Sequence, residues 1–353
     1  MSVPNPLPDA VPPAQGACLL AAAERSASVR SSAQCALTGV RAASAVRAKT
    51  ATTDAECDPA PVAIAILDSG VDSTHQEFTD GTHSLVTGDK PTAAGSASHC
   101  WHGTAVAGIV ATQLHALLDD AHVASSALIR SYRITNESGT VDESRIVAAM
   151  NDAMAQRVRV INLSASWPHR STPLREALLL AKPGAVTAAG ALVVVTSPGY
   201  LTRSGAQYPG IYADEDEYDF LVTVAGFGMQ RLLPHSVQTK DDRADPDKGP
   251  DNGWTPKILA APGKDIYTTL PGNRYGKVRG DSFAAPFVTG LATATLLQPG
   301  YLRLTASRLR TLLFDESRAA PAYLRNLGGG AGIHCIACAR FIERLNSPGV
   351  ERR

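Results

Sequence analysis

The sequence carries no excess of either charge, because Lys and Arg total 33, Asp and Glu total 33, and the formal net charge is zero. Aromatic residues make up only 5% of the chain, and no basic stripe with interleaved aromatics is present. Proteins whose main partner is nucleic acid usually carry a basic face, so this composition argues against nucleic acid as a partner. No purely apolar run reaches the roughly 18 residues of a membrane-spanning helix, so we expect no membrane partner either.

The N-terminus lacks the features of a secretory signal. It opens with prolines and an aspartate rather than with a basic region before an apolar one. This favours the cytoplasm.

Cysteine is scarce, with six residues in the whole chain. An even number allows disulfides, but the sequence alone cannot give the pairing, and inert buried thiols are equally compatible with it. Cys335 and Cys338 form a CxxC pair inside a predicted helix, and a metal site there would need a second pair of ligands that the sequence does not offer.

The sequence does have the apolar content of a globular protein, with 44% hydrophobic and 19% charged residues in 353. Residues 1–60 are rich in Ala, Ser and Pro, and we read them as an N-terminal extension. Residues 61–353 read as the main domain. A polar stretch at about 230–253, which contains a run of alternating acidic and basic residues, reads as a surface insertion in that domain.

Short apolar runs alternate with helical patterns through the main domain. This alternation predicts an α/β fold, a doubly wound and mostly parallel sheet with helices on both faces. The predicted strands are Val62–Leu67, Leu128–Ile134, Val158–Leu163, Ala191–Thr196 and Phe220–Ala225. The predicted helices are Ala105–Gln113, Val141–Gln156, Leu174–Ala181, Thr305–Glu316 and His334–Asn346.

A Gly-Asp-Ser turn at Ser282 runs directly into a long apolar segment of small residues that ends at Leu297. Pro286 is tolerated in the first turn of a helix, because the amides there have no intrahelical partner. The apolar positions surround the whole helix, so we expect this helix to be buried on every side. Ser282 would open it, where free amides and the helix dipole favour negative charge, although a serine at that position is more often a simple N-cap.

Two further residues belong with this serine. Asp68 ends the first buried strand, and His102 opens the small-residue helix that follows it. Taken singly, Asp68 could be a turn residue and His102 a cap or a surface histidine. Together they supply what a nucleophilic serine needs, an imidazole to accept its proton and a carboxylate to orient that imidazole. The carboxyl ends of the strands in such a sheet bring these groups to one edge.

In this pattern the chain resembles the subtilisin-like serine proteases, from about Pro61 to Leu297. The motifs are AILDSGVD, WHGTAVAG and GDSFAAPFVTG, in the family's order, with VINLSAS and AAPGKDIYTTLPGNRYGK between them. The resemblance implies a subtilisin-like catalytic domain over residues 61–353. It also favours secretion, so the compartment stays open between that and the cytoplasm.

The resemblance implies a hydrolase with Asp68, His102 and Ser282 as its catalytic triad. Ser164, Ala165 and Ser166 would form the strand that pairs with an extended protein or peptide substrate. We therefore expect a serine endopeptidase that works through an acyl-enzyme intermediate. Two alternatives stay open: a catalytically impaired pseudoprotease that binds extended peptides, and a peptide ligase or cyclase that passes the acyl group to an amine.

Three positions depart from the family pattern. Tyr200 stands where the family has the asparagine of its oxyanion hole, so Tyr200 donates instead, Thr202 or Ser204 substitutes, or the site is impaired. Asp281 stands before the nucleophile in place of the usual threonine, and its charge would oppose an oxyanion unless it is paired or turned away. Trp167 replaces a glycine and either narrows a specificity pocket or packs in the core.

The sequence indicates no required cofactor. Aspartates of the 240–248 run and the acidic cluster at 214–217 could bind a structural Ca²⁺, but neither forms a clear calcium motif, and solvated loops are the simpler interpretation. We expect no catalytic metal.

Overall fold

The computed structural model describes residues 10–11, 61–79, 84–88, 100–118, 126–196, 208–227, 258–315, 318–319 and 333–335. The insertion expected at about 230–253 lies outside these ranges, and so do all but two residues of the extension expected over 1–60. The predicted division into an extension and a domain at 61–353 therefore stays a prediction.

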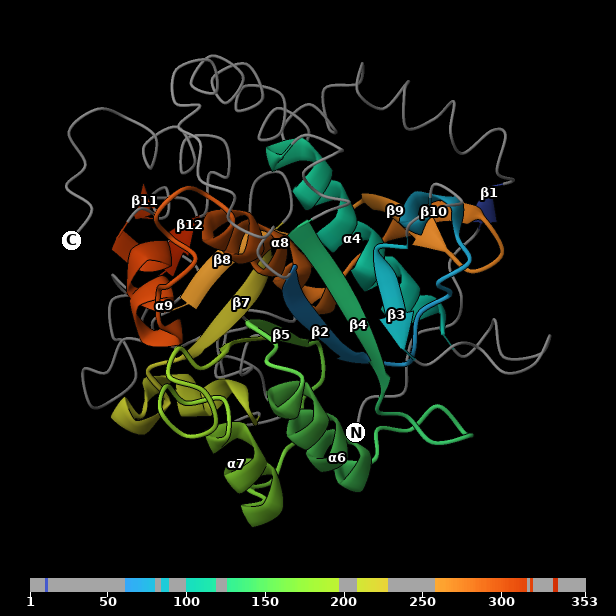
Figure 1. The fold of residues 1–353 in the computed structure, drawn as a ribbon. Helices are drawn as coiled ribbons and strands as arrows, with labels where there is room; N and C mark the ends of the chain where they lie inside the picture. The colour runs from blue at the N-terminus through green and yellow to red at the C-terminus, as the bar shows by residue number, and fades with distance from the viewer. Residues whose placement is uncertain are drawn as a thin grey trace, which may run out of the picture.

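One large sheet forms the centre of the described structure (Figure 1). Among the described residues it has nine strands in the order β11-β12-β8-β7-β6-β5-β2-β4-β3, and every neighbouring pair except β11–β12 is parallel. The strands are β2 (Val62–Asp68), β3 (Val86–Gly88), β4 (Ala127–Arg133), β5 (Val160–Leu163), β6 (Leu192–Thr196), β7 (Leu221–Phe227), β8 (Ile258–Pro262), β11 (Arg318–Ala319) and β12 (Ile333–Cys335). The predicted mostly parallel sheet is confirmed.

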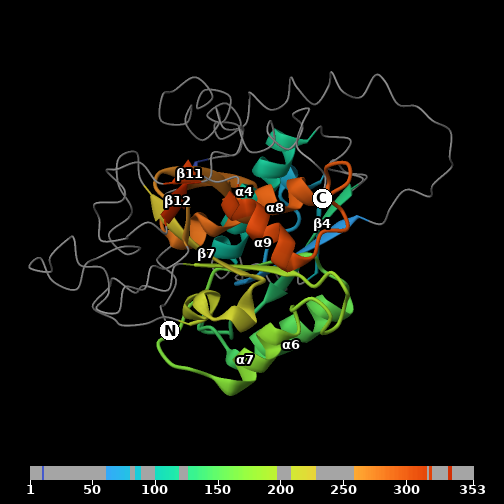
Figure 2. The same cartoon turned by 90° about the vertical axis from the view of Figure 1, so that its left-hand side faces the viewer.

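Helices cover both faces of this sheet. Figures 1 and 2 show α4 and α8 on one face and α6 and α7 on the other. The helices are α4 (Trp101–Leu117), α6 (Glu143–Ala155), α7 (Thr172–Leu179), α8 (Ala285–Leu296) and α9 (Ala306–Asp315). The sheet is therefore doubly wound, as the alternation of strands and helices predicts.

Strand β2 lies at the point where the order of the strands reverses. From β2 the chain adds β4 on one side, paired in register from Val62 with Ala127 to Asp68 with Arg133, and then β5 on the other side. In open α/β sheets, binding sites form at the carboxyl ends of the strands beside such a reversal. Asp68 is the last residue of β2 and therefore lies at that position.

A second, smaller sheet lies beside α4. It consists of β1 (Ala10–Val11), β10 (Arg274–Val278) and β9 (Ile266–Leu270), all antiparallel. The hydroxyls of Thr268 and Thr269 donate to backbone carbonyls of α4, at Ala105 and Thr104 respectively, both at 2.8 Å. A side chain at Gly108 would place its Cβ 2.2 Å from the Thr269 hydroxyl oxygen, so only glycine allows this close packing.

Helix α8 is buried along its whole length, from Ala285 to Leu296, as its apolar circumference predicts. It crosses α4, and a Cβ at Gly290 would lie 2.5 Å from Cβ of Gln113. Pro286 lies in the first turn, as expected. The predicted helix start at Ser282 is wrong, because Ser282 belongs to a 3₁₀ turn, η5 (Asp281–Phe283), and α8 begins only at Ala285.

The prediction of a terminal helix from His334 is also wrong where the structure can test it. Ile333–Cys335 form strand β12, which pairs in parallel with Ile258–Ala260 of β8. The edge of β8 presents unpaired backbone groups, and this long-range pairing satisfies them, which a local helix would not. The rest of that predicted helix, including Cys338, lies outside the described residues.

None of the helices in the described ranges combines the length and the apolar character that crossing a membrane would require.

Candidate active site

Asp68 lies at the carboxyl end of β2, a strand whose seven residues are all buried. Its carboxylate is 5% exposed, and its Oδ1 accepts a hydrogen bond of 2.6 Å from the backbone amide of Ser69. The backbone carbonyl of Asp68 accepts from the amide of Ile134, which ties the turn to the end of β4. Strand and turn together hold the carboxylate in one orientation.

His102 is the second residue of α4 and faces this carboxylate. Its Nδ1 lies 2.8 Å from Oδ1 and 2.9 Å from Oδ2 of Asp68. The Ser69 hydroxyl accepts from the amide of Gly103 at 3.0 Å, so the start of α4 is bonded to the turn that follows Asp68. A Cβ at Gly103 would lie 2.2 Å from the carbonyl oxygen of Gly70, so this approach requires glycine.

The environment of His102 favours the charged imidazolium. Burial by itself would lower the pKa of His102, but the charge of Asp68 and its hydrogen bond outweigh burial. The pKa of His102 is therefore raised above its ordinary value. An imidazole that gains stability on protonation is suited to accept a proton from a neighbouring hydroxyl.

Ser282 lies in the middle of turn η5, which begins directly after Gly280, and the φ of 140° at that residue suits glycine. The next residue, Phe283, packs its ring on the imidazole of His102, with centroids 4.9 Å apart. Turn η5 also packs against α4, the helix that carries His102. The structure thus brings Asp68 and His102 into direct contact and sets the Ser282 turn against the same imidazole.

Ser164, Ala165 and Ser166 follow the end of β5 and are partly buried. The hydroxyl of Ser164 donates to the backbone carbonyl of Ser282 at 3.1 Å. The expected substrate strand therefore begins beside the turn that carries Ser282, which the sequence motif alone did not indicate.

Comparison with known proteins decides the family. A family model for the subtilase family matches residues 60–331. The chain belongs to the subtilase family. As a subtilase it is a subtilisin-like serine protease, a hydrolase whose substrates are proteins or peptides.

Individual relatives agree with this assignment. Subtilisin DY of Bacillus licheniformis is 30% identical over 259 residues, which cover 72% of this chain and 82% of the relative. Subtilisin NAT of Bacillus subtilis subsp. natto is 29% identical over 239 residues, 67% of this chain, and the chain spans only 55% of that relative's length.

Two solved structures share the fold. A cold adapted subtilisin-like serine proteinase has a TM-score of 0.54 at 19% identity, covering 81% of this chain and 92% of the other. The prenylagaramide maturation protease PagA has a TM-score of 0.55 at 20% identity, covering 81% and 93%. The subtilisin-like fold is confirmed.

The departures of this subtilase from the family pattern have different outcomes. Tyr200, Thr202 and Ser204 lie outside the described residues, so the oxyanion prediction stays a prediction. The carboxylate of Asp281 is turned toward strand β7, because its Oδ1 accepts a hydrogen bond from the amide of Gly226 at 2.8 Å. Trp167 is 2% exposed in the hydrophobic core, so it packs rather than lining an open pocket.

The backbone of Trp167 is hydrogen-bonded to that of Tyr208, which lies far along the sequence. Trp167 and Tyr208 exchange two backbone hydrogen bonds, of 2.9 Å and 2.8 Å. This isolated bridge holds the end of the expected substrate strand.

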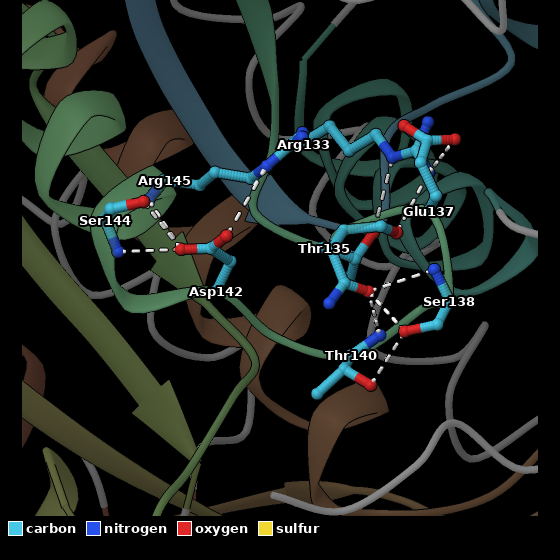
Figure 3. Close-up of polar contacts among 9 residues, drawn as sticks. Arg133, Thr135, Glu137, Ser138, Thr140, Asp142, Ser144 and Arg145 are labelled. Atoms are coloured by element: carbon cyan, nitrogen blue, oxygen red, sulfur yellow. Dashed lines mark hydrogen bonds and ion pairs between the residues drawn. The ribbon is translucent and has the colours of Figure 1, made fainter.

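The turn between β4 and α6 follows the strand that pairs with β2, and Figure 3 shows its polar contacts. Arg133, which pairs with Asp68 in the sheet, donates to the carbonyl of Asn136 at 3.1 Å and lies 3.8 Å from Glu137. The side-chain oxygen of Asn136 accepts from the amides of Ser138 and Thr140, both at 3.0 Å. Sequence reasoning missed this turn, although Asn-x-Ser-Gly is a recognisable turn signal.

Among the described residues, no group of three or more His, Cys, Asp or Glu side chains could hold a metal ion. In the acidic cluster at 214–217, Glu215 pairs with Arg170 at 3.3 Å and Glu217 with Arg175 at 2.6 Å. The expectation that no cofactor is required stays a prediction. Of the six cysteines, Cys100 is described as a buried thiol outside any disulfide.

Proposed function

We propose that this subtilase is a serine endopeptidase that cleaves peptide bonds within extended protein or peptide segments. The observation that supports the proposal best is the double contact of His102 Nδ1 with both carboxylate oxygens of Asp68, at 2.8 and 2.9 Å. With its proton on Nδ1, the imidazole has a basic Nε2 for the serine hydroxyl. The packing of Phe283 on the same ring supports Ser282 as that serine.

The reaction follows from these roles. Ser282 Oγ attacks the peptide carbonyl carbon while His102 takes the hydroxyl proton, which gives a tetrahedral oxyanion. His102 then gives the proton to the departing amine, and the C–N bond breaks to leave an acyl-enzyme. A water molecule, deprotonated by His102, then attacks the ester, and as the ester C–O bond breaks His102 returns the proton to Ser282 Oγ, which releases the acid and restores the serine. Asp68 stabilises the imidazolium and keeps its carboxylate charge throughout.

The oxyanion is stabilised by the backbone amide of Ser282, with the hydroxyl of Tyr200 as the second donor. Substituting Tyr200→Phe keeps the ring and removes only the hydroxyl. Loss of such a donor lowers turnover by about 10²–10³-fold in a related site. Unchanged turnover in Tyr200→Phe would mean that another group is the second donor, and Thr202 and Ser204 would be substituted next.

The substrate binds by adding a strand to Ser164, Ala165 and Ser166, whose backbone continues from the end of β5 beside Ser282. Backbone pairing of this kind selects an extended polypeptide. The zero net charge and the low aromatic content give no support to a nucleic-acid partner.

The test is covalent labelling with a fluorophosphonate, which reacts only with an activated serine hydroxyl. We expect wild-type protein to be labelled on Ser282, and Ser282→Ala to lose both the label and proteolysis of a denatured protein substrate. Absence of label from folded wild-type protein would favour the peptide-binding pseudoprotease. Label together with joined or cyclic peptide products would identify acyl transfer to an amine instead of to water.

A further inference from the structure

The backbone carbonyl of Ser282 lies in turn η5, directly before α8, so its helical donor would have to come from the first turn of α8. In an α-helix a carbonyl accepts from the amide four residues further along the chain. Four residues after Ser282 stands Pro286, which has no backbone N–H. The carbonyl of the nucleophile's own residue therefore needs a partner from elsewhere in the protein.

Ser164 supplies that partner. Its hydroxyl donates to the Ser282 carbonyl at 3.1 Å, across 118 positions of sequence. Ser164 lies just beyond the carboxyl end of β5, so a rigid strand of the central sheet fixes the position of its hydroxyl. Without this bond the peptide between Ser282 and Phe283 would be held only by the Phe283 amide, which donates to the Gly280 carbonyl at 3.1 Å, and the direction of Ser282 Oγ would be less well fixed.

The Ser164 hydroxyl is itself held by a chain of buried side chains. The side-chain amide of Asn162 donates to Ser164 Oγ at 2.8 Å, and Thr289 Oγ donates to Asn162 Oδ1 at 2.9 Å. Asn162 and Thr289 are both fully buried. Because the Asn162 amide donates to Ser164 Oγ, the Ser164 proton is free to point at the Ser282 carbonyl. The Thr289 hydroxyl also lies 3.3 Å from the carbonyl of Ala285, and its contact with Asn162 is the shorter of the two.

The other side of the turn is bonded to the sheet as well. Asp281 Oδ1 accepts from the amide of Gly226 in β7, at 2.8 Å. Strands β5 and β7 flank β6 in the sheet. The turn that carries Ser282 is thus bonded to two strands, one on each side, through Ser164 and Asp281.

We propose that Ser164 is a positioning residue for the nucleophile, and that the chain Thr289–Asn162–Ser164 holds the Ser282 carbonyl and thereby directs Ser282 Oγ toward His102. The proposal rests on the function proposed above. Ser164 acts through its hydroxyl, which is separate from the backbone role of the same residue in pairing with substrate.

The experiment compares four variants of the full chain: Ser164→Ala, Ser164→Thr, Thr289→Val and Thr293→Val. Thr293→Val is the matched control, since Thr293 lies one turn further along α8, is equally buried, and donates only to the carbonyl of Thr289 at 2.9 Å. The measurements are kcat and KM with a peptide substrate, the rate of fluorophosphonate labelling, and the free energy of unfolding.

We expect Ser164→Ala to lower kcat and the labelling rate by about 5- to 10-fold with KM unchanged, as for one lost hydrogen bond. Ser164→Thr, which keeps the hydroxyl, should recover most of the loss. Thr289→Val should lower kcat by about 2- to 5-fold and Thr293→Val should not, although both lose comparable unfolding free energy.

The proposal is overturned if Ser164→Ala is labelled as fast as wild type, or if Thr289→Val and Thr293→Val change kcat equally. Those outcomes differ from failure of the proposed function, in which wild-type protein itself takes no label and hydrolyses no peptide.

Discussion

Substituting Asp68→Asn tests the carboxylate–imidazole pair at the centre of the site. Oδ1 of Asp68 accepts from the amide of Ser69 at 2.6 Å, so the remaining oxygen of the new asparagine should stay there. The NH₂ group then takes the position of Oδ2, which lies 2.9 Å from His102 Nδ1. Since an NH₂ group donates, Nδ1 must accept, and the imidazole proton moves to Nε2.

An imidazole with its proton on Nε2 cannot accept one from a serine. A wrong tautomer of this kind costs about 10⁴-fold in turnover, or about 5 kcal/mol of transition-state stabilisation. The loss of the Asp68 charge also removes the cause that raises the pKa of His102, and burial, which lowers it, remains. We therefore expect the acid limb of the kcat/KM profile to move to lower pH in the variant.

The assay is the pH dependence of kcat and kcat/KM with a chromogenic peptide. Asp72→Asn is the control. Asp72 is a buried carboxylate in the loop that follows β2, and it accepts hydrogen bonds from the amides of Gly272 and Thr74 instead of contacting His102. The control should lose stability and keep kcat within about threefold of wild type. An Asp68→Asn enzyme within about tenfold of wild-type turnover at neutral pH would refute the assigned role of Asp68.

Three further predictions concern the surroundings of this pair. Asp281→Asn keeps an acceptor for the Gly226 amide and removes a charge that is turned away from the oxyanion, so kcat should stay within about twofold of wild type, and a clear rise in kcat would show that the charge does repel the oxyanion. His75 is fully buried, donates from Nε2 to the Arg274 carbonyl at 3.0 Å, and has its pKa lowered by burial despite that bond and nearby carboxylates. Its neutral form therefore contributes stability that is complete above about pH 6.5 and is lost as the pH falls through the lowered pKa. Chemical denaturation at several pH values should show a weaker acid-side decline in His75→Gln than in wild type, and parallel curves would contradict this. Gly103→Ala forces a Cβ to within 2.2 Å of the Gly70 carbonyl, so calorimetry should record a loss of about 1–3 kcal/mol, and a variant as stable and active as wild type would show that the two turns can separate freely.

Much of the fold could be predicted because its strands are continuous apolar runs. Val62–Leu67 is such a run, and it is buried on both faces of the sheet, as expected for a central parallel strand. The helix predicted over Val141–Gln156 begins two residues later, where Asp142 accepts from the amides of Ser144 and Arg145 and ends the preceding turn. Helix boundaries of this kind are set by capping groups, which hydrophobic periodicity does not reveal.

The hairpin of β9 and β10 was not predicted, although its turn carries a recognisable signal. Pro271-Gly272-Asn273 joins the strands, and Gly272 and Asn273 both have positive φ, at 76° and 55°. The strands themselves are rich in Thr and charged residues, so no apolar run indicated them. Strand β9 packs against α4, a contact between distant parts of the sequence.

The candidate site, like the fold, has a part that local sequence patterns predict and a part that depends on contacts between distant segments. The places of Asp68, at the end of an apolar strand, and of His102, at the start of a helix of small residues, could be predicted from local patterns, whereas the 3₁₀ turn that holds Ser282 could not. The link from Thr289 through Asn162 could not, since it depends on how α8 crosses the sheet. The proline four residues after Ser282 was the one local clue that its carbonyl would need a distant donor.

The complete burial of α8 has a practical consequence for anyone who handles the enzyme. Helix α8 follows directly after the turn that carries Ser282 and has no solvent-facing side on which to loosen, so we expect this turn to keep its place for as long as α8 stays packed in the core. Residual activity after heating should therefore count surviving native molecules, and inactivation and unfolding should follow one and the same time course.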